Sequence, residues 1–499
     1  MDKLTELKAR LAEVDDLENA AALLEWDQLV MMPPDGAEGR SHQYATLQKI
    51  AHEKFVDEAV GRLIEDLSAA YADAPADDDN AALVRVAKRH YARQTRLPTA
   101  LVEAMSQATS QGQAVWAKAR ANNDFEAFRP DLERIYELKR QTAACFPEAE
   151  TPYDALLDEF EPGMKTSQVR AMFVELKREQ VPLAQAIAAR GAANDSLLRR
   201  DYDPDKQLAV SVEALKLFGY DFEAGRQDLT VHPFCTSFGP RDVRVTTRVD
   251  RHYLPTCLMG TMHECGHALY ELGFPARYAR SPLGHSASLG IHESQSRMWE
   301  NLVGRSRGFW DVFYPTVQAA FPENLAEVDA AAFHRAINTV KPSFIRVEAD
   351  EVHYNLHTLL RFELEVDLLE GRLETRHAPA AWNAKFKEYL GLDVPNDRLG
   401  ILQDTHWAAG LIGYFPTYTI GNLLSVQFFE KAVRDRPTLP DELRAGQYGG
   451  LLAWLRENVH CHGRKHLPTD LVRMVTGQPL TAGPYLNYLK TKYGELYGL

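Results

Sequence analysis

Two histidines, His263 and His267, are the pair in this sequence best spaced to bind one metal ion. Their spacing of four residues is about one helical turn, so both imidazoles project from the same face of a helix. Glu264 follows His263 directly and can reach a water on that ion without replacing it. Zinc lowers the pKa of its bound water towards neutrality, and a nearby carboxylate can accept the proton as the water attacks a carbonyl carbon. The pattern predicts a hydrolytic metal centre with Glu264 as its base.

A catalytic zinc needs a third protein ligand and one open position. Glu293 stands 26 residues after His267, in the next helical segment, and would complete a two-histidine, one-glutamate site. His285 and His292 are rival ligands. His285 lies in a Gly-rich loop, and His292 is more simply placed behind the ligands or facing the substrate. We therefore expect His263, His267 and Glu293 to be the metal ligands.

The expected cofactor is one Zn²⁺ per chain, because zinc is the usual ion of a His₂Glu site, although Co²⁺ or Mn²⁺ could substitute. A second histidine pair, His462 and His466, also has helical spacing. Gly463 and Pro468 indicate that a helix ends there, and no third donor follows at short range. A second metal site is not expected at that position.

Helical periodicity dominates the elements that must position these residues. Leucines and alanines recur at three- and four-residue steps over residues 3–24, and a second helix is expected from Arg40 to about Phe55. A further helix start is expected near Asn80, and helical patterns continue to about residue 220. They resume near Tyr253, which places the HExxH segment on a helix.

Residues 231–250 are the best candidate for a β-hairpin, because a Gly-Pro turn precedes alternating Val243, Val245, Thr247 and Val249. The chain is therefore expected to be mainly α and elongated, with helical subdomains around a cleft and one small sheet near the active site. We expect a single domain over residues 1–499, with a helical part at 1–230, the hairpin at 231–250 and a catalytic helical part at 251–499.

Composition excludes several other classes of protein. Among 499 residues, 45% are hydrophobic and 25% charged, as in ordinary globular proteins, and the net charge of −14 argues against nucleic acid as a partner. The N-terminus lacks the features of a secretory signal, and no apolar stretch is long enough to span a bilayer. Five scattered cysteines without a CxxC pair are typical of reduced thiols. We expect a cytoplasmic protein with no membrane partner.

Five motifs, in order, resemble those of the thermostable carboxypeptidases related to carboxypeptidase Taq. They are DxRxT at 242–246, HExxH at 263–267, HESQ at 292–295, IRxxAD at 345–350 and GxxQDxHW at 400–407. Trp26-Asp27 with Met32-Pro33, and the stretch 413–418, extend the resemblance over essentially the whole chain. HExxH alone occurs in many metallopeptidases, whereas five motifs in order are far more specific.

This resemblance implies a mostly helical fold with a deep substrate groove, a homodimer, and metal-dependent release of C-terminal residues from peptides with broad side-chain preference. It also implies that the segment His232-Pro233-Phe234 and the DxRxT segment close one end of the groove. His232 is therefore a candidate substrate-binding residue.

A carboxypeptidase must recognise a terminal carboxylate, and a planar guanidinium pairs well with two oxygens. Arg346 is the first candidate because it lies in the motif that resembles the family's substrate-facing segment, and Arg244 is the second. The alternative for Arg346 is an internal ion pair with Glu348, Asp350 or another acid.

The oxyanion of the tetrahedral intermediate needs hydrogen-bond donors besides the metal. His406 and Tyr418 can supply an imidazole N–H and a phenolic O–H. The alternatives are a packing role for His406 beside Trp407 and a role for Tyr414 in place of Tyr418. Asp404 could orient His406 or a metal ligand, and the alternative is a helix N-cap or a surface position.

Two other functions fit parts of the pattern. A zinc oligopeptidase or dipeptidyl carboxypeptidase can share the same chemistry and a helical groove. A non-catalytic, zinc-stabilised helical binding protein is the alternative from another class. Glu264 would have no use in such a protein, and structural zinc usually has four protein ligands.

Overall fold

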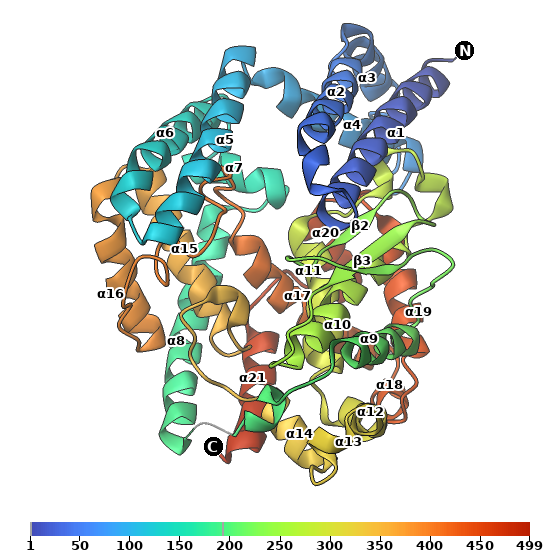
Figure 1. Ribbon diagram of the computed structural model, residues 1–499. Coiled ribbons are helices and arrows are strands. Elements are labelled where there is room, and N and C mark those ends of the chain that lie inside the picture. The colour runs from blue at the N-terminus through green and yellow to red at the C-terminus, as the bar shows by residue number, and fades with distance from the viewer. Residues whose placement is uncertain (1, 192–193) are drawn as a thin grey trace.

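The computed structural model describes residues 2–191 and 194–499 and is built almost entirely from helices (Figure 1). This architecture confirms the mainly α prediction. Four N-terminal helices stand together at the top of Figure 1: α1 (Lys3–Val30), α2 (Ala37–Phe55), α3 (Glu58–Ala70) and α4 (Asp79–Arg96). The expected starts near Arg40 and Asn80 lie within a few residues of the observed ones. Asp78 caps α4 by accepting hydrogen bonds from the backbone N–H groups of Asn80 and Ala81.

These four helices enclose a hydrophobic cluster of their own, which includes Leu7, Leu11, Ile64 and Leu83. Tyr278 and Leu283 from the rest of the chain complete it. A second, much larger cluster extends from Ala119 to Tyr493. The N-terminal helices therefore pack around their own core and join the body where Tyr278 and Leu283 enter it.

The body has two sides in Figure 1. One side contains α5 (Thr99–Asn122), α6 (Phe125–Ala144), α7 (Pro152–Phe160), α8 (Thr166–Arg190), α15 (Tyr354–Leu369) and α16 (Ala378–Leu390). The other contains α9 (Pro204–Phe218), α10 (Pro255–Glu271), α12 (Arg307–Ala320), α13 (Pro322–Leu325), α14 (Ala330–Ile337), α18 (Leu439–Arg444) and α19 (Gly449–Asn458). Between them run α11 (Leu289–Arg297), α17 (Pro416–Asp435), α20 (Pro468–Thr476) and α21 (Gly483–Tyr497).

The small sheet has three strands in the order β1 (Gln227–Leu229), β3 (Val243–Thr247), β2 (Cys235–Ser237). Strands β2 and β3 form the expected antiparallel hairpin, with Cys235 opposite Val245. Strand β1 adds a parallel pairing that the sequence does not signal, because three residues are too few to display alternation. Val243 and Val245 are fully buried, and β3 packs against α10. The sheet thus supports the helix that carries the HExxH motif.

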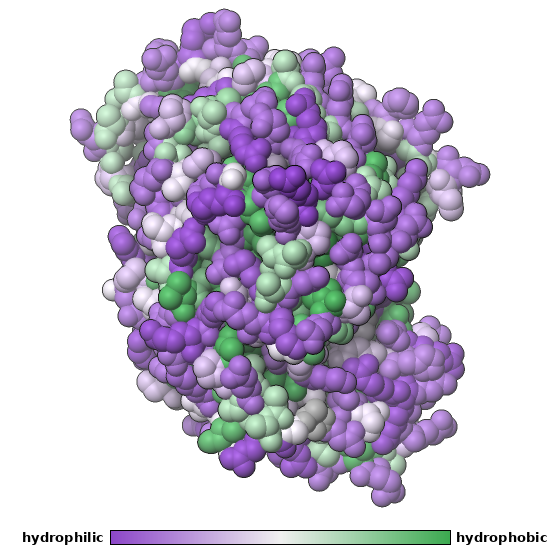
Figure 2. All heavy atoms as spheres, turned by 90° about the vertical axis from the view of Figure 1, so that its left-hand side faces the viewer, coloured by the Kyte–Doolittle hydropathy of each residue, from purple (hydrophilic) through white to green (hydrophobic). Residues whose placement is uncertain are grey.

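The face of the molecule on the side of α5, α6, α8 and α16 is mostly polar (Figure 2). Figure 2, which views the side formed by α5, α6, α8 and α16, shows mostly hydrophilic residues with apolar ones in small separate patches. Within the described ranges, no helix is both long and apolar enough to cross a membrane.

Candidate active site

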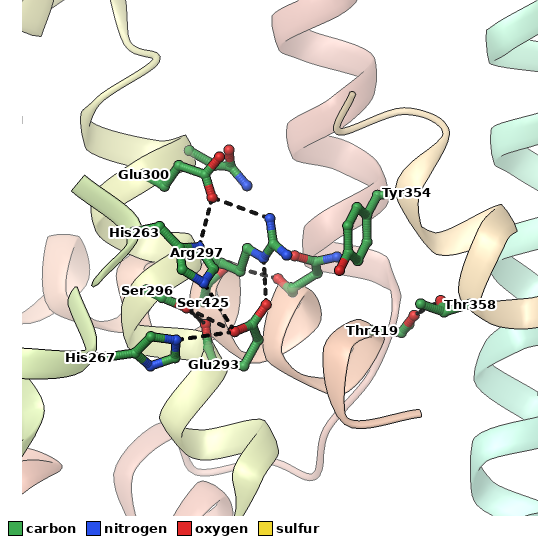
Figure 3. A network of polar contacts seen from close by, with 12 residues as sticks. His263, His267, Glu293, Ser296, Arg297, Glu300, Tyr354, Thr358, Thr419 and Ser425 are labelled. Atoms are coloured by element: carbon green, nitrogen blue, oxygen red, sulfur yellow. Dashed lines mark hydrogen bonds and ion pairs between the residues drawn. The ribbon is translucent and has the colours of Figure 1, made fainter. Parts of the chain in front are cut away.

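Helix α10 presents His263 and His267 on one face, and α11 places Glu293 opposite them (Figure 3). The Glu293 Oε2 atom lies 3.5 Å from His263 Nε2 and 3.4 Å from His267 Nε2. One nitrogen or oxygen from each residue falls within 4.8 Å of the others. Two imidazoles and one carboxylate converging in this way form a donor set that suits a divalent metal such as zinc.

The Glu293 carboxylate is held by its own helix. Arg297 Nε donates a 2.7 Å hydrogen bond to Oε1, and Ser296 Oγ donates a 3.1 Å bond to Oε2. The Arg297 guanidinium also stacks over the ring of Tyr354, 4.4 Å from its centre. Because Oε1 is engaged by Arg297, Oε2 is the oxygen directed towards the histidines.

His263 is oriented by Glu300, whose Oε2 lies 2.9 Å from His263 Nδ1. Burial would raise the pKa of Glu300, but Arg297 and His263 outweigh it and lower that pKa to about 2. An ionised carboxylate only accepts hydrogen bonds, so Nδ1–H donates and Nε2 keeps its lone pair for a metal. Glu300 lies in η5 (Met298–Val303), a π-helical turn that continues α11. Sequence reasoning missed Arg297 and Glu300, although they lie within about one and a half helical turns after the HESQ motif.

Two glycines let neighbouring helices approach α11 closely. A Cβ at Gly266 of α10 would lie 2.5 Å from the Gln295 carbonyl oxygen, and one at Gly421 of α17 would lie 2.5 Å from Glu293 Cγ. Neither contact is tolerable, so only glycine allows these helix spacings. The distance between the histidines and Glu293 therefore depends on the glycine inside the HExxH motif.

Glu264 is buried beside His263 on α10, with 7% of its surface exposed. Burial raises the pKa of its carboxyl group to about 7. A carboxylate with a pKa near neutrality can both take and return a proton, as a general base requires.

The rival ligands lie elsewhere. His285 Nε2 contacts Asp15 Oδ1 at 2.9 Å. His292 Nε2 contacts Glu271 Oε1 at 2.8 Å, and its ring stacks on His267 with centroids 4.4 Å apart. His292 thus packs against the ring of the candidate ligand His267. Residues 2–191 and 194–499 contain one cluster of metal-competent side chains, and the His462–His466 pair is not part of it.

Arg346 is buried, at 3% exposure, and paired with Asp404. Its Nε and Nη2 donate to Asp404 Oδ1 at 3.2 and 2.9 Å, and Nη1 donates to the Tyr354 hydroxyl at 2.8 Å. Arg361 Nε donates to the other Asp404 oxygen at 2.7 Å. Burial would raise the Asp404 pKa, but the two arginines hold it well below its usual range. The acid that pairs with Arg346 is therefore Asp404, not Glu348 or Asp350.

His406 and Tyr418 lie together, with Nε2 and the hydroxyl oxygen 3.1 Å apart. The Arg346 guanidinium stacks over Tyr418 at 4.6 Å from the ring centre, and Tyr414 packs against Tyr418 at 5.4 Å. Burial lowers the pKa of His406 to about 4, so this imidazole is neutral at pH 7. Burial, with a smaller contribution from the charge of Glu293, raises the pKa of both tyrosines. Asp404 is 3.9 Å from His406 Nδ1, too far for a hydrogen bond.

Arg244 and His232 belong to the hairpin region. Arg244 Nε and Nη2 each donate to Asp242 at 2.8 Å, and the guanidinium stacks over the rings of Trp26 and Phe238. His232 is exposed just before β2. In the part of the chain that the structure describes, neither residue contacts the three candidate ligands.

The carboxypeptidase Taq (M32) metallopeptidase family matches residues 6–493 of this chain. This chain belongs to that family. The chain is accordingly a metal-dependent peptide hydrolase of the carboxypeptidase type, as the sequence predicted. Membership implies a divalent metal, and His263, His267 and Glu293 form a fitting donor set.

Known relatives and a solved structure match this chain over nearly its full length. Thermostable carboxypeptidase 1 of Thermus thermophilus is 42% identical and aligns with 97% of this chain and 96% of its own length. Carboxypeptidase 1 of Bacillus subtilis is 37% identical and aligns with 98% of this chain and 97% of its own length. The crystal structure of an M32 carboxypeptidase from Deinococcus radiodurans superposes with a TM-score of 0.96 at 43% identity and covers 100% of both chains.

Proposed function

We propose that this metallocarboxypeptidase releases single C-terminal residues from peptides of varied sequence, using one Zn²⁺ held by His263, His267 and Glu293. The observation that carries the proposal is the convergence of three ligand atoms within 4.8 Å. Glu300 and Arg297 hold His263 and Glu293 in place from behind. Such a constellation is built for a metal with an open position.

Bound there, the metal would acidify a water and polarise the scissile carbonyl. Glu264 takes the proton of the attacking water on its carboxylate and passes it to the leaving amine. Its burial, at 7% exposure, and its raised pKa support this role. Neither proton transfer requires a further acid or base.

Tyr418 is proposed to donate its O–H to the developing oxyanion. His406 is neutral and can donate its Nε2–H to the Tyr418 oxygen, which leaves the phenolic proton free for the substrate. In this arrangement His406 acts through Tyr418. Tyr414, packed against Tyr418, is the alternative donor.

Arg346 is proposed to bind the terminal carboxylate of the substrate. A guanidinium carries five N–H donors, and Asp404 and Tyr354 accept one from each of its three nitrogens, which leaves two N–H donors for the substrate. Asp404 thereby holds the guanidinium over the ring of Tyr418. Arg244 is the second candidate, and His232 is proposed to contact the substrate where the hairpin closes the groove.

We further infer that residues 1–499 form a single domain, that two copies associate as a homodimer, and that the protein is cytoplasmic. The family match over residues 6–493 supports the first inference. Five free cysteines support the third. Light scattering on the purified protein tests the dimer, and a single cooperative unfolding transition tests the domain.

A time course on a peptide of mixed sequence, with bound metal measured by mass spectrometry, tests the proposal. Stepwise release of single C-terminal residues, abolished by a chelator and restored by Zn²⁺, is expected. Dipeptide products would favour a dipeptidyl carboxypeptidase and internal fragments an oligopeptidase. Intact peptide in the presence of stoichiometric zinc would favour a binding protein.

A further inference from the structure

A cavity of about 660 Å³ lies between the N-terminal helices and the body. Its walls come from α4, the end of α7, the turn before α11 and the segment that leads into α20. A volume of this size is within the range of ligand-binding sites in proteins. None of the three candidate metal ligands, and none of the residues proposed for catalysis or substrate binding, lines it.

One ring contact and one shared helix connect the wall of this cavity to the metal site. Phe160, in its wall, packs edge-on against Tyr414 with ring centroids 5.2 Å apart. Ser288, also in its wall, caps α11 and precedes Glu293 by five residues, about 7.5 Å along a helix. An extended peptide advances about 3.3–3.6 Å per residue. An extended segment of two to four residues is therefore long enough to span the distance from Glu293 to the cavity wall.

The cavity is rich in positive charge although the chain has a net charge of −14. Arg85, Arg89, Arg464 and Lys465 line it, together with the carboxylates of Glu159 and Asp470. Two of the four cations are already paired: Arg89 with Asp158 and Lys465 with Asp79, each at 2.7 Å.

Arg85 and Arg464 are the cations left over. Arg85 donates to the Ala76 carbonyl oxygen at 2.7 Å, and Arg464 donates to the Ser286 carbonyl oxygen at 2.9 Å. Among the described residues, no carboxylate lies within ion-pair distance of either guanidinium. Burial and the neighbouring Arg464 and Arg89 lower the pKa of His90, also in the wall, to about 3. Glu271 and Glu18 stabilise the charge of Arg464 from beyond ion-pair distance, so neither guanidinium is directly paired with a carboxylate of the described ranges.

We propose that this cavity receives the part of the peptide substrate on the amino-terminal side of the scissile bond, and that Arg85 and Arg464 favour acidic side chains there. The inference rests on the proposed function and adds a preference to it. The C-terminal residue itself stays at the metal, so broad preference for the released residue and an acidic preference upstream are compatible. An arginine pairs with a carboxylate through two parallel N–H donors, which gives direction as well as attraction.

The test uses the metal-loaded enzyme and a set of peptides with the same length and the same C-terminal residue. They carry glutamate, glutamine or lysine at the third and fourth positions from the C-terminus. We expect kcat/KM to fall in that order, with glutamate preferred over glutamine by roughly tenfold at low salt and less at high salt. Equal kcat/KM values for the three peptides would overturn the proposal and leave the carboxypeptidase activity intact.

Matched variants assign the preference to this cavity. Arg85→Gln and Arg464→Gln should each reduce the glutamate-to-glutamine ratio by about threefold or more. Lys88→Gln removes the same charge from an exposed position on the same helix, outside the cavity lining, and should leave the ratio unchanged. A ratio that survives both arginine variants would place the preference elsewhere and overturn the assignment.

Peptide affinity measured on metal-loaded Glu264→Gln protein separates this inference from the proposed function. Peptide binding to this variant does not depend on hydrolysis. Tighter binding of the glutamate peptide, lost in the Arg85→Gln/Glu264→Gln double variant, would support the cavity even if products differed from those proposed. Equal affinities for the three peptides would overturn it.

Discussion

The Nδ1 atom of His263 lies 2.9 Å from Oε2 of Glu300, a residue 37 positions later in the chain. The pair determines which nitrogen of the imidazole faces Glu293. It connects the helix that carries HExxH to a π-helical turn that the motif does not include. Glu300 in turn contacts Arg297, which binds Glu293. Two of the three candidate ligands are thus held by one network of charges.

Glu300→Gln should weaken metal binding about 10- to 100-fold, because His263 loses the ionised acceptor that fixes its tautomer. The side chain keeps its size, so folding should be retained. A competition titration with a chromophoric zinc chelator measures the change. Glu323→Gln, at an exposed position, is the control. Unchanged zinc affinity in Glu300→Gln would exclude this role.

Glu264→Gln should lower kcat by roughly 10²–10⁴-fold, the usual contribution of a general base. Zinc content should stay at one per chain, since Glu264 is not among the candidate ligands. Single-turnover hydrolysis and metal analysis on the same sample measure the rate of the chemical step and the zinc content. Normal hydrolysis with normal zinc content would remove Glu264 from the mechanism.

Arg346→Ala should lower kcat/KM by about 10- to 100-fold for peptides with a free C-terminal carboxylate, because a charge-assisted pair is lost. C-terminally amidated peptides should lose much less. Comparing the two losses distinguishes carboxylate binding from a packing defect, which would reduce both equally. If Arg244→Ala shows the selective loss instead, the second candidate holds the carboxylate.

Gly266→Ala should reduce the free energy of unfolding by about 1–3 kcal/mol and weaken zinc binding, because its Cβ would meet the backbone of α11. Gly260→Ala is the matched control on the same helix. A Cβ there meets nothing within 4 Å, so this variant should be neutral or more stable by up to about 1 kcal/mol. Chemical denaturation and zinc titration of both variants provide the test. Equal behaviour of the two would contradict the close-approach argument.

Glu161 should make stability depend on pH. It is 1% exposed, and burial raises its pKa from 4.5 to about 8. Between these values the folded protein binds more protons than the unfolded chain, so this group's contribution to stability is largest below about pH 4.5. It falls as the pH rises towards 8. Glu161→Gln should remove this slope and stabilise the protein at pH 8, by at most about 5 kcal/mol. The unfolding free energy of each protein is measured from pH 5 to 8. If it changes equally in the unmodified protein and in Glu161→Gln, Glu161 does not cause the pH dependence.

The sequence by itself determined the helical architecture, the hairpin, and the candidates His263, Glu264, His267 and Glu293. The helices, the hairpin and the pairing of His263 with His267 depend on periodicity within a short segment, where backbone geometry converts spacing into direction. Glu293 followed from the need of a catalytic zinc for a third ligand in the next helical segment. The five motifs in order were also enough to predict the family.

Only the tertiary structure decided which partners these residues have. Arg346 pairs with Asp404, 58 positions away, and the basic cavity joins Arg85 to Arg464 across most of the chain. Strand β1 pairs in parallel with β3, and its three residues are too few to predict that pairing from the sequence. Such contacts depend on how helices pack. Local propensity says which face of a helix is apolar, but not which distant charge will be placed against it.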